Sequence, residues 1–148
     1  VAAASIAWRS PNDYSVLSFG KEVVAAKSQD AHKSNEGVVD AVLALRGFGT
    51  TDVAGALAAA REQLGRSRAA RKITILLSDC RATAHGSGDA ESAIGVAVAA
   101  RQVEELLIIA PADDDEAARE LAAATGSRIT TVTGPSDASA ALARVLDT

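Results

Sequence analysis

Several features common in folded proteins are scarce or missing in this chain of 148 residues. It contains no methionine, one cysteine and only 3% aromatic residues, although 48% of its residues are hydrophobic. A core with so few aromatic side chains has to be built from Val, Ile, Leu and Ala, which suits helices packed closely on a sheet. The length predicts one domain with a single three-layer core.

The lone cysteine, Cys80, cannot form a disulfide within the chain, and this favours the cytoplasm over an oxidising compartment. A complete translation product starts with methionine, whereas this chain starts at Val1, so we expect a fragment or a processed piece. Residues 1–8 are typical of the end of a helix and not of a signal peptide, because no basic segment precedes them.

A net positive charge and long apolar runs are also lacking. The net charge of -4 argues against nucleic acid as the main partner, because neutralising phosphates requires clustered Lys and Arg. No apolar run approaches the roughly 20 residues that span a bilayer, so no membrane association is expected. The chain has no P-loop lysine motif. Gly47 and Gly49 are not a dinucleotide fingerprint, because they follow a predicted helix and lack the third glycine.

Turn residues and hydrophobic spacing predict the order of the elements. After a turn at residues 10–13, two β-rich runs can pair as a hairpin, at 14–19 and 22–26. Two helices then follow with no strand between them, at 34–46 and 51–64. The remainder alternates, with strands at 73–78, 106–110 and 128–133 and helices at 89–101, 113–124 and 136–146.

These elements define the fold class. The last three strands are near-continuous apolar runs, as expected when helices cover both faces of a parallel sheet. The sequence therefore predicts an α/β protein of the Rossmann-like, three-layer αβα type, with a mostly parallel sheet and one antiparallel edge strand from the hairpin. Because no internal repeat, low-complexity tract or linker is evident, residues 1–148 are expected to form one domain.

Two segments carry most of the functional information. Residues 47–57 (Gly-Phe-Gly-Thr-Thr-Asp-Val-Ala-Gly-Ala-Leu) are typical of a glycine-rich loop that turns into a helix, and residues 72–79 (Lys-Ile-Thr-Ile-Leu-Leu-Ser-Asp) of a buried strand that ends on a carboxylate. Both would lie at the carboxyl edge of the sheet, where α/β folds keep their sites. Here the chain resembles a von Willebrand factor type A domain, whose metal-ion-dependent adhesion site uses a loop Thr-Asp and a strand-end Asp in this order.

The resemblance implies that Thr51 and Asp79 are metal ligands. Mg²⁺ takes oxygen ligands and keeps several waters, so Asp79 can act directly or through a bridging water. Thr50 is an alternative to Thr51, since the doubled threonine leaves the register open by one residue. A further interpretation needs no metal: Thr or Asp at the start of a helix caps its unpaired N–H groups.

The chain departs from the family pattern in two places. The first metal motif, Asp-x-Ser-x-Ser after the opening strand, is not visible; residues 137–141 come near it in letters but begin the last helix, where Ser136 or Asp137 is better interpreted as a cap. Where the family usually has Gly after the strand-end Asp, this chain has Cys80 followed by Arg81, whose guanidinium competes with a cation. We therefore expect an incomplete magnesium site.

The missing motif also bears on the sheet. In the family the opening strand sits centrally, between the hairpin and the strand at 73–78. The resemblance thus implies a single domain that lacks its first strand, and a sheet with a gap or exposed edges, which favour aggregation.

As to function, the resemblance implies a protein-interaction module and not an enzyme, in which Mg²⁺ leaves one coordination position for an acidic residue of the partner. The Ala-rich sequence is similar to bacterial intracellular members that work with AAA-type ATPases, as in magnesium chelatase, so a partner of that class is expected. Two alternatives stay open: a small α/β hydrolase or transferase that uses Cys80, with His85 nearby in sequence, and a structural type A domain without metal.

Two charged clusters are interpreted without a site. Residues 113–116 (Asp-Asp-Asp-Glu) place negative charge in the first turn of a helix, where it complements the dipole. Five basic residues flank the connection from a helix to the strand at 73–78 and are interpreted as a solvated face, with docking of an acidic partner as the alternative: Arg61, Arg66, Arg68, Arg71 and Lys72.

Overall fold

The computed structural model describes residues 13–20, 22–34, 36–38, 52–81 and 89–146, which form two sheets and the helices around them. Strands β1 (Val16–Phe19) and β2 (Val23–Lys27) pair as an antiparallel hairpin. Strands β3 (Thr74–Leu77), β4 (Leu106–Pro111) and β5 (Arg128–Val132) form a parallel sheet in that order, with β4 in the centre. No helix in these ranges is long and apolar enough to cross a membrane.

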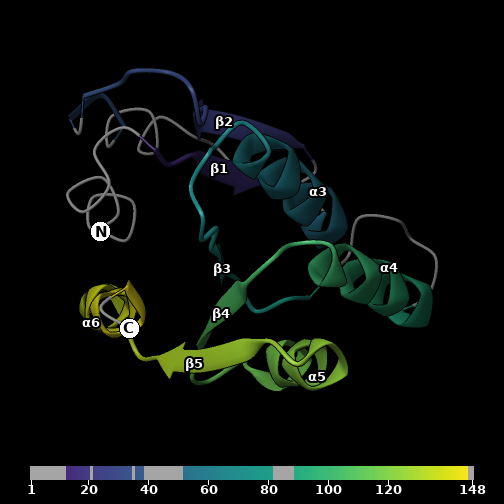
Figure 1. The fold of residues 1–148 in the computed structure, drawn as a ribbon. Helices are drawn as coiled ribbons and strands as arrows, with labels where there is room; N and C mark the ends of the chain where they lie inside the picture. Colours follow the sequence, from purple (N-terminus) through teal and green to yellow (C-terminus); the bar gives the residue numbers. More distant parts are fainter. Residues whose placement is uncertain (1–12, 21, 35, 39–51, 82–88, 147–148) are drawn as a thin grey trace.

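The central strand β4 buries both of its faces. Leu106, Ile108 and Ala110 point to one side, where α3 (Val53–Leu64), α4 (Asp89–Arg101) and α5 (Glu116–Thr125) pack. Leu107 and Ile109 point to the other side, against α6 (Pro135–Leu146). Figure 1 shows the resulting three layers, with α6 on one side of the parallel sheet and α4 and α5 on the other. The alternation follows from the two-residue period of a strand.

Helix α3 contacts both sheets. Its Val53 and Leu57 are almost fully buried in the same cluster as Leu76 of β3, and Phe19 of β1 packs against that cluster. No strand of the hairpin pairs with a strand of the parallel sheet in the described ranges. Helix α3 links the two sheets there, because it packs against both β1 and β3. Figure 1 shows the hairpin beyond β3, at the end of the sheet opposite β5.

The α/β, three-layer prediction with a mostly parallel sheet and an antiparallel hairpin is confirmed. Strand boundaries agree to within two residues. The largest difference is in α5, which begins at Glu116 and not at Asp113, because Asp114 N–H donates to the Pro111 carbonyl (3.1 Å) and turns the chain before the helix. Of the helix predicted at 34–46, residues 36–38 are helical and 39–46 lie outside the described residues, as does the segment 1–8.

Candidate functional site

The loop after β3 lies at the carboxyl edge that the sequence singled out. Ser78 N–H still donates to Ile109 of β4 (3.1 Å), which fixes where β3 leaves the sheet. Two short side-chain bonds then shape the turn: Ser78 Oγ accepts from Cys80 N–H (2.9 Å), and Asp79 Oδ1 accepts from Arg81 N–H (2.9 Å). Side chains of Ser and Asp commonly form such local turns, so these bonds need no ligand.

Cys80 has a left-handed backbone, with φ of 63°, and no other non-glycine residue in the described ranges has a positive φ. Such a conformation costs an L-residue about 1–2 kcal/mol, whereas glycine adopts it freely. A glycine, which the resemblance leads us to expect at this position, would adopt the turn without that cost. Burial offsets part of the cost, because Cys80 is only 7% exposed and belongs to the core cluster with Leu76.

The same burial controls the chemistry of the thiol. It raises the pKa of Cys80 to about 12, with a further rise from the nearby Asp79 carboxylate that a hydrogen bond to Ser78 partly counters. At neutral pH the side chain is thus a neutral thiol, whereas a nucleophilic cysteine requires the thiolate. His85, the companion considered from the sequence, lies outside the described residues, and His32 is exposed in a loop.

Arg81 ties the loop after β3 to the loop after β4. Its Nη2 and Nε donate to Asp114 Oδ1 at 2.6 and 3.0 Å. Hydrogen bonding to Asp114 raises the pKa of Arg81, which stays charged. The sequence led us to expect that this guanidinium competes with a cation for Asp79. In the structure the guanidinium pairs with Asp114 instead, and the hydrogen bond from Arg81 to Asp79 comes from the backbone N–H.

The start of α3 forms another part of this region. Asp52 is the N-cap: its Oδ1 accepts from Gly55 N–H (2.8 Å), and its own N–H donates to the Gly20 carbonyl beyond β1 (2.8 Å). The cap considered for Thr51 is thus made by its neighbour. Thr51 itself lies outside the described residues, so its role as a metal ligand stays a prediction. A Cβ added at Gly55 would come within 2.3 Å of Asp52 Oδ2, which explains the glycine.

Replacing the cap gives a direct stability prediction. Asp52→Ala is expected to lower the free energy of unfolding by about 1 kcal/mol, because Gly55 N–H loses its acceptor. Urea titration followed by circular dichroism measures the change. Asp113→Ala removes the same charge from an exposed side chain with no hydrogen bond in the structure and should change stability by less than about 0.5 kcal/mol. Equal losses in the two variants would contradict the capping role.

The described residues do not fit a magnesium site by themselves. They contain no group of three or more His, Cys, Asp or Glu side chains placed to hold a metal ion. Asp79 offers one carboxylate, and one of its oxygens already accepts from Arg81. Asp137 lies in the first turn of α6, where its carboxylate accepts hydrogen bonds from the N–H and the hydroxyl of Thr133, just after β5. It thus stabilises the start of the helix, as one of the two caps considered from the sequence, and is not placed as a metal ligand.

Two of the five residues of the basic cluster around β3, Arg66 and Arg71, are in ion pairs. Arg71 makes a two-pronged contact with Glu105 (2.9 Å for both bonds), which also accepts from Arg128, and Arg66 lies 3.3 Å from Asp30. These guanidinium groups are substantially exposed, so each pair contributes little to stability. The interpretation as a solvated face thus fits these residues better than a free basic patch.

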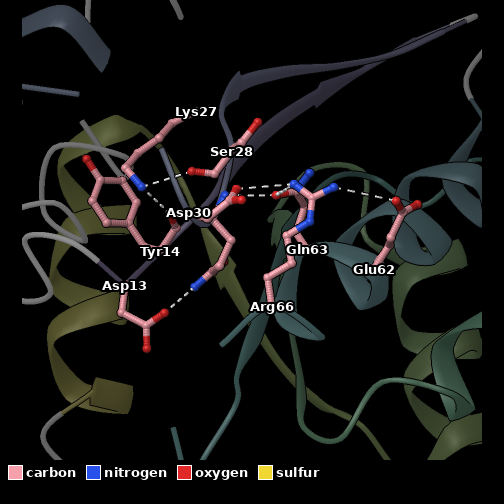
Figure 2. A network of polar contacts seen from close by, with 9 residues as sticks. Asp13, Tyr14, Lys27, Ser28, Asp30, Glu62, Gln63 and Arg66 are labelled. Atoms are coloured by element: carbon pink, nitrogen blue, oxygen red, sulfur yellow. Dashed lines mark hydrogen bonds and ion pairs between the residues drawn. The ribbon is translucent and has the colours of Figure 1, made fainter. Parts of the chain in front are cut away.

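The sequence did not predict that one charged side chain, Lys27, is buried. Lys27, at the end of β2, is 2% exposed; its Nζ donates to the carbonyls of Tyr14 (2.6 Å) and Ser28 (3.0 Å) and lies 4.3 Å from the Tyr14 ring centre. Figure 2 shows this ammonium between the ring and the two carbonyls. Burial lowers the pKa of Lys27, and the Asp13 and Asp30 carboxylates partly counter the shift. The one sequence signal was a lysine directly after an apolar strand.

Among solved structures, the chain is similar to a von Willebrand factor type A protein from Catenulispora acidiphila. The similarity has a TM-score of 0.70 and covers 97% of this chain, at 17% sequence identity. This chain has the von Willebrand factor type A fold. This chain spans 36% of the length of the matched chain, so the similarity concerns only that part of the larger protein. No family model and no curated protein matches the sequence.

Proposed function

We propose that this type A fold serves as a protein-interaction module that binds its partner at the carboxyl edge of the parallel sheet. The observation that carries the proposal is the fold itself together with the loop after β3, which presents Asp79 beside the Arg81–Asp114 pair. Type A domains commonly mediate protein interactions. The half-buried Asp79 and the exposed Arg81 give that edge both signs of charge, which suits a polar partner surface.

Magnesium is a secondary part of the proposal. Thr51 and Asp79 are the proposed ligands, and Mg²⁺ bound there would offer a coordination position to an acidic residue of the partner. Of these two residues only Asp79 lies in the described ranges, which hold no group of three or more candidate ligands, so we expect dissociation constants in the millimolar range or weaker.

The partner that we propose is an AAA-type ATPase in the cytoplasm, on the similarity to intracellular type A subunits. A single, buried, unpaired cysteine supports a reducing compartment. We propose no enzymatic activity for Cys80, because its buried thiol has a pKa of about 12.

The metal is tested by calorimetric titration of the chain with Mg²⁺ and with Mn²⁺. We expect no saturation at micromolar concentrations. Micromolar binding that Asp79→Ala removes would show that the site is more complete than proposed.

The interaction surface is tested by capture on the immobilised chain, with bound proteins quantified with and without EDTA. Asp79→Ala is expected to weaken capture of the specific partner at least about tenfold, while thermal melting stays close to that of the unmodified chain. Glu120→Ala on the exposed side of α5 is the matched control. Capture that survives both Asp79→Ala and Asp114→Ala would place the interaction on another surface.

A further inference from the structure

The described loops at the carboxyl edge of the sheet carry one positive charge among several negative ones. They comprise residues 78–81 after β3, 112–116 after β4 and 133–137 after β5. Their one basic residue is Arg81, and their acidic residues are Asp79, Asp113, Asp114, Asp115, Glu116 and Asp137. The dipoles of α5 and α6 favour negative charge at the helix starts, but carboxylates held close together repel one another. Any charge balance within these loops therefore depends on Arg81.

Arg81 is bonded to carboxylates of two neighbouring loops at once. Its backbone N–H donates to Asp79 Oδ1 (2.9 Å), and its Nε and Nη2 donate to Asp114 Oδ1 (3.0 and 2.6 Å). The hydrogen bonds and the charge of Asp114 raise the pKa of Arg81, and the carboxylates of Asp79 and Glu116 raise it further. The guanidinium therefore lies within electrostatic reach of three carboxylates, one from the loop after β3 and two from the segment between β4 and α5.

The turn before Arg81 fixes where its side chain leaves the backbone. Ser78 Oγ accepts from Cys80 N–H (2.9 Å), and the Cys80 side chain is 7% exposed and belongs to the core cluster. Arg81 follows directly, and its side chain is 60% exposed. A buried residue thus anchors the chain next to the exposed guanidinium, so the positive charge is held at this edge by the fold and not by a ligand.

A guanidinium and Mg²⁺ can both balance carboxylates, but they do so on different terms. Mg²⁺ requires several oxygen ligands in near-octahedral geometry, and the described residues hold no group of three or more candidates. A guanidinium is always charged, and its planar set of N–H donors suits carboxylate oxygens without any further ligand. The contacts of Arg81 therefore give a physical reason why the described residues do not fit the metal that the resemblance implies.

We infer that Arg81 is the fixed cation of the carboxyl edge, where its guanidinium balances the carboxylates of Asp79, Asp114 and Glu116 in place of a divalent metal ion. A divalent ion brought to Asp79 is repelled by this guanidinium, in line with the weak Mg²⁺ binding proposed above. The edge thus keeps a positive charge that EDTA does not remove. That binding of a partner there is insensitive to EDTA rests on the proposed function, whereas the charge balance does not.

The test is a titration with Mn²⁺ alone at low ionic strength, followed by paramagnetic broadening of the amide signals of Asp79 and Asp114 in NMR spectra. Arg81→Gln removes the charge and keeps a polar side chain, and it should tighten Mn²⁺ binding at these two residues at least about tenfold. A unit charge at roughly 5 Å from a divalent ion has an effect of that size even in water. Arg81→Lys keeps the charge and should bind Mn²⁺ as weakly as the unmodified chain.

Arg119→Gln in α5 is the matched control. It removes the same charge and breaks a similar exposed ion pair, from Arg119 to Asp115 (2.7 Å), and should change Mn²⁺ affinity less than about threefold. Dispersed amide spectra show that each variant is folded, as expected for exposed ion pairs. Equal tightening in Arg81→Gln and Arg119→Gln, or none in Arg81→Gln, would overturn the inference.

The partner experiment separates this inference from the proposed function. Capture that Asp79→Ala leaves unchanged contradicts the proposed function, but it does not alter the Mn²⁺ result. If Asp79→Ala weakens capture, capture by the unmodified chain should be the same with and without EDTA. Capture that EDTA abolishes would show that a metal ion, and not Arg81, supplies the positive charge at this edge, and would overturn the inference.

Discussion

Ile108→Ala is expected to lower the free energy of unfolding by about 2–5 kcal/mol. Ile108 has no exposed surface and lies in the middle of β4, the central strand of the parallel sheet. Its side chain packs into the cluster that α3, α4 and α5 share, so truncation leaves a cavity where three helices meet the sheet. For a domain of this size the loss corresponds to a fall in melting temperature of roughly 4–20 °C.

The matched control is Ile94→Ala in α4. Ile94 is 65% exposed, so the same truncation removes few contacts and should change stability by less than about 0.5 kcal/mol. Denaturant titrations of both variants, with the slope of the transition compared, separate lost packing from a change in the unfolded state. Equal effects at the two positions would contradict the assignment of the core to the α3–α4–α5 face.

The packing around Ile108 was foreseeable because strand β4 has an unmistakable pattern. Its continuous apolar run, Leu-Leu-Ile-Ile-Ala at 106–110, has no polar position that could face water, so helices had to lie on both sides. The structure places Ile108 on one face and Leu107 on the other, as this reasoning requires. Periodicity also identified α3 and α6, whose apolar residues recur at helical spacing.

The details of the site were harder to foresee because they depend on contacts between distant segments. Nothing near Arg81 in the sequence indicates that its guanidinium pairs with Asp114, 33 residues away. The helix start was ambiguous for a different reason: three adjacent residues, Thr50, Thr51 and Asp52, can all cap a helix. The choice of Asp52 depends on backbone geometry, since its N–H also bonds the Gly20 carbonyl after β1.

The buried lysine and the cavity between β1 and β3 show the same limit. In the sequence, Lys27 is a charged residue at the end of a strand. In the fold its ammonium lies against the Tyr14 ring and donates to two backbone carbonyls. Residues of both β1 and β3 line this cavity, although the two strands are more than 50 residues apart in the chain and belong to different sheets. Sequence patterns specify which face of each strand is buried, but not what lies along its edge.

The thiol of Cys80 is expected to react with iodoacetamide about a thousandfold more slowly in the folded chain than in guanidinium chloride at the same neutral pH. Burial raises its pKa from 9.0 to about 12, and three pKa units reduce the reactive thiolate fraction by that factor. Loss of access at 7% exposure slows the reaction further. Quenched time courses, analysed by mass spectrometry, measure both rates.

The same shift predicts how stability depends on pH. Because the folded-state pKa of Cys80 lies above the unfolded value of 9.0, its contribution is fully present below pH 9.0 and is lost as the pH rises toward about 12. Cys80→Ala should remove this part of the alkaline decline while keeping the small buried volume, and Ser78→Ala, which removes a bond that partly lowers the pKa, should not. If Cys80 instead reacts rapidly in the folded chain with an apparent pKa below 9.0, the buried neutral thiol is wrong. A nucleophilic role at the end of β3 would then have to replace the interaction module as the function of this edge.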